Sequence, residues 1–117
     1  MSRGAAAISE RWTAIDGLRL HALAATRLAP PAAPIVVLVH GVGVASPYFV
    51  PTIEALAADF RVFAVGLPGF GRSGKPPRAL DIGELADALA AWLGAEGIAR
   101  PIVLGNSVGC QVVVDFA

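Results

Sequence analysis

One stretch of the sequence decides the fold: Pro101-Ile102-Val103-Leu104-Gly105-Asn106-Ser107-Val108-Gly109-Cys110-Gln111-Val112-Val113-Val114. A short apolar run breaks at Gly105, turns around Ser107 and resumes as a second apolar run. A nucleophile on a tight strand-to-helix turn has strained backbone dihedrals, so the glycines that flank Ser107 at a distance of two residues prevent collisions. The alternative is an ordinary strand-to-helix join in which the serine only caps the helix. The strand-like run before the turn favours the nucleophile.

A second glycine-rich turn follows the run Ile35–Val39, whose continuous apolar, β-branched character predicts a strand buried on both faces. The turn reads His40-Gly41-Val42-Gly43. In open α/β sheets, ligands bind at the carboxyl ends of the strands. A backbone N–H group of this turn and that of Val108 could therefore form a two-donor oxyanion hole, although an ordinary turn would show the same glycines.

The remaining elements predict a mostly parallel sheet with an antiparallel hairpin at the N-terminus. Asp16-Gly17 separates two alternating runs, as in a hairpin, and Ser46-Pro47 and Asp81 with Glu84 are helix-start signals. We expect the first of these helices to reach Asp59, and Gly94 and Gly97 to end the second. Strands that alternate with helices predict right-handed crossovers. We expect five strands in the order 1-2-4-3-5, with parallel strands that end near Val39, Val65 and Leu104.

The composition narrows the class of protein. The chain has 117 residues, of which 56% are hydrophobic and 15% are charged, which fits one small domain with a largely buried sheet. The chain has nine basic and nine acidic residues and thus no net positive charge. The composition therefore does not indicate binding to nucleic acid or to an anionic membrane. One cysteine and no signal-peptide pattern favour a cytoplasmic location. The apolar stretch from Ile35 to Val50 is interrupted too often to span a membrane.

Two motifs are misleading. Gly69-Phe70-Gly71-Arg72-Ser73-Gly74 matches the dinucleotide pattern G-x-G-x-x-G, but Lys75-Pro76-Pro77 follows where that site needs a helix. Cys110 lies one turn into an apolar helix without a cationic neighbour to activate its thiol. We therefore expect no cofactor and no metal.

The chain resembles the α/β-hydrolase superfamily over nearly its whole length. The resemblance is carried by three segments in the order of that family: Val39-His40-Gly41, Leu67-Pro68-Gly69-Phe70-Gly71-Arg72-Ser73 and Gly105-Asn106-Ser107-Val108-Gly109. The serine in the turn from Gly105 to Gly109 is similar to the nucleophile of esterases, lipases and related acyl-transfer enzymes. Epoxide hydrolases and haloalkane dehalogenases have an aspartate nucleophile at this position. Gly66 stands where many relatives have aspartate, which affects the expected geometry of that loop.

The resemblance implies that Ser107 is the nucleophile and that the N–H groups of Val108 and Val42 are the oxyanion donors. His40, Gly41, Gly43, Gly105 and Gly109 would support these turns. The implied activity is hydrolysis of small-molecule substrates with an ester-like or other acyl or carbonyl group, without partner nucleic acid or membrane. The oligomeric state is left open.

The family places its acid and its histidine later in the sequence, so we expect residues 1–117 to be a partial domain that stops shortly after the nucleophile. His40 is expected to brace its loop, His21 to be a packed or surface side chain of the hairpin, and Asp115 to have a structural role on the helix after Ser107. A serine without a base is a weak nucleophile, so this chain alone should be nearly inactive. The alternative is a non-catalytic interaction module that keeps the scaffold. The sequence that follows Ala117 would separate the two.

Overall fold

The computed structural model describes residues 8–39, 49–69, 73–77, 80–105 and 108–116. Strands and helices alternate along these residues after an N-terminal pair of strands. They are, in order, β1 (Ser9–Ile15), β2 (Leu18–Ala25), β3 (Ile35–Val39), α1 (Val50–Leu56), β4 (Arg61–Val65), α2 (Ile82–Glu96), β5 (Ile102–Gly105) and α3 (Val108–Phe116).

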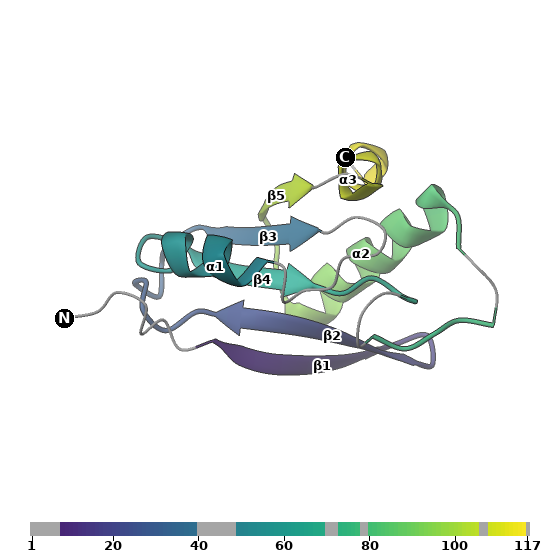
Figure 1. Cartoon of the computed structure of the whole chain (residues 1–117), viewed down its shortest axis with the longest axis horizontal. Helices are drawn as coiled ribbons and strands as arrows, with labels where there is room; N and C mark the ends of the chain where they lie inside the picture. The colour runs from purple at the N-terminus through teal and green to yellow at the C-terminus, as the bar shows by residue number, and fades with distance from the viewer. Residues whose placement is uncertain (1–7, 40–48, 70–72, 78–79, 106–107, 117) are drawn as a thin grey trace.

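The five strands form one sheet in the order β1-β2-β4-β3-β5, as predicted (Figure 1). β2 pairs antiparallel with both β1 and β4, whereas β3 pairs parallel with both β4 and β5. The chain thus has an α/β fold in which the three parallel strands lie together and the hairpin extends one side.

The β1–β2 hairpin turns at the predicted Asp16-Gly17 pair. Both residues have positive φ, 48° for Asp16 and 81° for Gly17. Two consecutive residues with positive φ are the mark of a type I′ turn, whose twist matches that of the flanking strands. This turn fixes the register in which Trp12 lies opposite His21.

The sheet is covered on both faces, which explains the continuous apolar run of β3. Val36 and Leu38 pack on one face in a cluster with Ile53 of α1. Val37 and Val39 pack on the opposite face in a second cluster that contains the core of α2. Alternate residues of one strand therefore enter two cores, so that no position on β3 is left for a polar residue.

The predicted start of α2 is confirmed, and one of the two glycines predicted to end it does so. Asp81 is the N-cap, and its side chain accepts a hydrogen bond from the Glu84 N–H at 2.8 Å. The Glu84 carboxylate accepts one from the Asp81 N–H at 3.0 Å, which completes the capping box. Gly97 ends the helix with a φ of 71°, a left-handed conformation in which glycine is favoured. Gly94, which was also expected to end the helix, lies inside it.

Replacing Asp81 by alanine is expected to lower the free energy of unfolding by about 0.5–2 kcal/mol, because the N-cap hydrogen bond is lost. Thermal unfolding followed by circular dichroism measures this loss. Asp87→Ala, at an exposed position on the same helix, is the control and should change stability by less than about 0.5 kcal/mol. Equal losses in the two variants would contradict the capping role.

The helix α1 is shorter than predicted. Its described part begins at Val50 with Phe49 as the N-cap residue, and Ala57 is its C-cap. The sequence pattern extended the helix to Asp59, but residues 57–59 form a turn in which the Asp59 N–H donates to the Leu56 carbonyl at 3.1 Å. The predicted start at Ser46-Pro47 lies outside the described residues.

A polar contact ties the edge strand β1 to the C-terminal end of α2. The Glu96 carboxylate accepts hydrogen bonds from Arg11 Nη2 at 2.6 Å and from Thr13 Oγ1 at 2.5 Å. The Glu96 side chain is only 7% exposed. A carboxylate in the last turn of a helix is unfavourable next to the negative end of the helix dipole, so that Arg11 compensates this charge.

The glycine-rich loop after β4 is fastened to β2 through Ser73. The buried Ser73 hydroxyl donates to the Gly66 carbonyl at 2.7 Å and accepts from the His21 N–H at 2.8 Å. Backbone bonds from the Gly66 N–H to the His21 carbonyl and from the Gly74 N–H to the Arg19 carbonyl, both 2.7 Å, flank this contact. Residues 74–77 are not helical, as Lys75-Pro76-Pro77 indicated.

Candidate functional site

The three parallel strands have their carboxyl ends at the same end of the sheet. Val39, the last residue of β3, lies in register with Gly105 of β5 on one side and with Val65 of β4 on the other. The two glycine-rich turns predicted from the sequence therefore start from neighbouring strands at the same level. The residues that follow, including Ser107 and the predicted loop residues His40, Gly41, Val42 and Gly43, lie outside the described part of the chain.

The strand-to-helix connection after β5 is very short. Gly105 ends the strand and Val108 begins α3, so that only positions 106 and 107 join them. The first N–H groups of a helix have no partner within the helix, and the helix dipole makes this end electropositive. A residue at position 107 is thus attached directly to a helix N-terminus whose first residue is Val108. Gly109, in the first turn, is buried.

His21 does not lie where a base for Ser107 is needed. It sits on β2, three strand positions from β5 in the sheet, which corresponds to roughly 14 Å at about 4.8 Å per strand. Its ring is buried, with Nε2 at 2.8 Å from a Glu10 carboxylate oxygen, and it packs against Trp12 with ring centroids 4.8 Å apart and an interplanar angle of 56°. Of the two alternatives predicted for this histidine of the hairpin, packed or on the surface, the structure shows the packed one.

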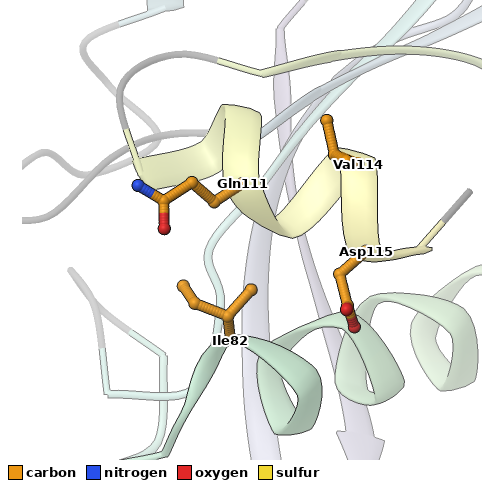
Figure 2. Close-up of a pocket in the computed structure, with 4 residues that line it drawn as sticks. All are labelled: Ile82, Gln111, Val114 and Asp115. Carbon is orange, nitrogen blue, oxygen red and sulfur yellow. The ribbon is translucent and has the colours of Figure 1, made fainter.

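Asp115 lies beside the first turn of α2. A Cβ atom added at Gly83 would be 3.8 Å from Asp115 Oδ2, so that a negative charge stands near the positive end of the α2 dipole. Asp115 also lines an open depression of about 480 Å³ between the two helices, together with Ile82, Gln111 and Val114 (Figure 2). Asp115 is the only one of these four lining residues with an ionisable side chain, so they offer no acid–base pair.

A second cavity, of about 360 Å³, lies at the hairpin side of the molecule. Its lining residues come from the β1–β2 turn, the loop after β4 and the first half of α2: Ile15, Asp16, Leu18, Pro68, Pro76, Pro77, Leu80, Glu84, Asp87 and Ala88. The part of this lining that comes from the β1–β2 turn belongs to the side of the sheet opposite to β5.

Within the described residues, no three histidine, cysteine, aspartate or glutamate side chains form a group that could hold a metal ion. None of the described helices has the length and apolar composition needed to cross a lipid bilayer.

Comparison with known proteins agrees with this architecture. The sequence model of the alpha/beta hydrolase family matches residues 36–117, which include β3, β4, β5 and the turns at their carboxyl ends. The chain belongs to the α/β hydrolase family. The match begins at β3, so that the family assignment rests on the parallel part of the sheet.

Three family relatives illustrate the similarity. A pimeloyl-[acyl-carrier protein] methyl ester esterase of Vibrio atlanticus is 42% identical over 84 residues, which are 72% of this chain and 31% of that protein. The crystal structure of a membrane phospholipase A superimposes with a TM-score of 0.87 at 30% identity, over 97% of this chain and 36% of that one. Epoxide hydrolase A of Mycobacterium thermoresistibile superimposes with a TM-score of 0.82 at 30% identity, over 94% and 34%.

The chain spans between about a fifth and a third of the length of the curated relatives that it matches. The relatives include an ester hydrolase and an epoxide hydrolase. The fold alone therefore does not determine which type of bond is hydrolysed. In this chain the two positions between β5 and α3 are Asn106 and Ser107.

Proposed function

We propose that this chain carries the nucleophile of a serine hydrolase that acts on small molecules with an ester-like or other acyl or carbonyl group. The observation that carries the proposal is the register of Val39 with Gly105, together with the two-residue connection from β5 to α3. In this arrangement the two glycine turns start next to each other, at the carboxyl ends of neighbouring strands. Open α/β sheets bind ligands at the carboxyl ends of their strands.

In the proposed reaction, the Ser107 hydroxyl attacks the carbonyl carbon of the substrate. The N–H groups of Val108 and Val42 donate hydrogen bonds to the oxygen that becomes negative, and Gly105 and Gly109 leave space for the turn. Two such donors should lie about 3 Å from the oxyanion. The position of the Val108 N–H at the start of α3 adds the positive end of a helix dipole.

The base that takes the Ser107 proton is not among the described residues, because His21 is held by Glu10 on a distant strand. We propose that the acid and the histidine belong to polypeptide outside this sequence, in the part of the fold by which the relatives exceed this chain in length. Loss of the base costs on the order of 10⁶ in turnover in a serine protease. We further propose a cytoplasmic enzyme that needs no cofactor.

The test uses p-nitrophenyl acetate and three proteins: the 117-residue chain, its Ser107→Ala variant, and the product of the reading frame that continues beyond Ala117. We expect the 117-residue chain to turn over far more slowly than about 1 per second, the lower end of common enzyme rates. The longer protein should reach that range and lose at least about 10³-fold with Ser107→Ala.

A second measurement separates a missing base from a missing nucleophile. Imidazole added to the 117-residue chain should accelerate acylation of the protein, observed as a mass increase located at Ser107, and Ser107→Ala should abolish it. If the longer protein is inactive, or is equally active with Ser107→Ala, the serine is not the nucleophile. An inactive longer protein would favour the non-catalytic interaction module.

A further inference from the structure

The cavity of about 360 Å³ between the β1–β2 turn, the loop after β4 and the first half of α2, here called the hairpin cavity, is formed by segments that all precede β5. β2 runs antiparallel to β4 with Ala22 opposite Val65, so that Leu18 lies four positions beyond the carboxyl end of β4. The hairpin cavity therefore lies toward the end of the sheet to which the parallel strands point (Figure 1). Open α/β sheets bind ligands at this end.

Most of the lining of the hairpin cavity is apolar. Ile15 belongs to the buried cluster on the α2 face of the sheet, and Leu18 and Leu80 pack against that cluster. The other apolar residues of the lining are Pro68, Pro76, Pro77 and Ala88. The volume lies in the lower part of the range of about 300–1,000 Å³ that is typical of small-molecule sites, which combine apolar walls with a few polar groups. The hairpin cavity thus matches the apolar body of a small molecule.

The polar side chains of the described lining are all carboxylates: Asp16 from the β1–β2 turn, and Glu84 and Asp87 from α2. Glu84 is engaged in the capping box of α2. Asp16 and Asp87 are exposed and have no hydrogen-bond or ion-pair partner among the described residues. The positive end of the α2 dipole is worth only about half an elementary charge, so two carboxylates outweigh it.

We propose that the hairpin cavity binds a small organic cation that has an apolar body, and that Asp16 and Asp87 recognise its ammonium group. The apolar body leaves water by packing on the leucine and proline side chains, which supplies affinity without regard to charge. The two carboxylates accept charge-assisted hydrogen bonds from the ammonium. They favour a cation over a neutral molecule of the same shape, and they disfavour an anion.

Three probes with the same aromatic ring test the charge preference: 2-phenylethylammonium, 2-phenylethanol and 3-phenylpropanoate. Each is titrated into the 117-residue chain and into the product of the reading frame that continues beyond Ala117, and amide shifts are followed by NMR. We expect the cation to bind with a Kd on the order of 1 mM, as for a ligand with few heavy atoms, and to shift Leu18 and Ala88. The alcohol should bind at least about threefold more weakly, because exposed ion pairs contribute little each, and the anion more weakly still.

Two isosteric substitutions test the recognition. Asparagine adopts the positive φ of 48° that Asp16 has in the turn, and position 87 is exposed on α2. Asp16→Asn combined with Asp87→Asn should therefore stay folded, raise the Kd of the cation at least about threefold and leave that of the alcohol unchanged. Asp59→Asn, an exposed carboxylate in the turn after α1, is the matched control and should change neither.

Ala88→Phe tests the location, because the larger side chain fills the hairpin cavity and should abolish binding of all three probes. Circular dichroism verifies that each variant is folded. Equal affinity for the cation and the alcohol, or an unchanged Kd in the double asparagine variant, would overturn the proposal. Binding to the 117-residue chain but not to the longer protein would also overturn it, since other polypeptide would then occupy the cavity. Ser107→Ala should bind the cation like the wild type, so the result is independent of the proposed nucleophile.

Discussion

Replacing Trp92 by alanine is expected to lower the free energy of unfolding by about 3–5 kcal/mol, the usual loss for a large aromatic residue in a core. Trp92 is fully buried on α2 and packs edge-to-face against Phe63 of β4, with ring centroids 5.7 Å apart and an interplanar angle of 76°. It therefore joins the longest helix to the centre of the sheet. Chemical denaturation followed by circular dichroism measures the loss.

Trp92→Phe is the informative control, because the indole Nε1–H is buried without a hydrogen-bond partner among the described residues. A buried donor that is left unsatisfied costs about 1–3 kcal/mol in the folded state. Phenylalanine removes this donor while it keeps most of the ring, so the gain partly offsets the smaller volume. We expect Trp92→Phe to be within about 1.5 kcal/mol of the wild type. A loss as large as that of Trp92→Ala would show that the indole nitrogen is bonded.

Ser73→Ala is expected to destabilise the chain by about 2–4 kcal/mol. The substitution leaves two backbone groups without their partner, the Gly66 carbonyl and the His21 N–H, in a buried environment. Each unsatisfied buried group costs about 1–3 kcal/mol. Because the loop after β4 then loses its contact with β2, amide hydrogen exchange at His21 and Gly74 should accelerate more than exchange in β3.

The control for Ser73→Ala is Ser9→Ala, the same chemical change at the far end of the same sheet. The Ser9 hydroxyl makes one long, partly buried hydrogen bond of 3.4 Å to the Ala24 carbonyl. Its loss should change the free energy of unfolding by less than about 0.5 kcal/mol. If the two alanine variants have the same stability, Ser73 is not the fastening point of the loop.

The features of the fold that were predicted from the sequence are those that a local pattern specifies. Strand β3 was recognised because burial on both faces demands apolar residues at every position, and the hairpin because Asp16 and Gly17 tolerate positive φ. The start of α2 was recognised because its cap is made by residues three positions apart. The end of α1 was missed because its apolar stripe continues past the last helical turn.

Contacts between distant parts of the sequence have no such pattern. Ser73 and His21 are 52 positions apart, and Arg11 and Glu96 are 85 positions apart. A serine in a glycine-rich loop and a glutamate at a helix end look like ordinary surface residues until the sheet order is known. For the candidate site, the sequence predicted the meeting of two turns, and the register of β3 with β5 agrees with it. The roles of Ser107, Val42, Val108, His40, Gly41 and Gly43 stay predictions.

The sheet order also has a consequence for how the chain folds. The hairpin joins neighbouring segments and can form within microseconds, whereas Val36 of β3 must find Ile102 of β5, 66 positions later. Pairing across such a separation first loses the conformational entropy of the intervening loop, and contacts compensate for this loss only afterwards. The pairing is therefore slow. During synthesis, β5 also leaves the ribosome after β1 to β4. We expect the strand that leads to Ser107 to be the last of these five strands to dock.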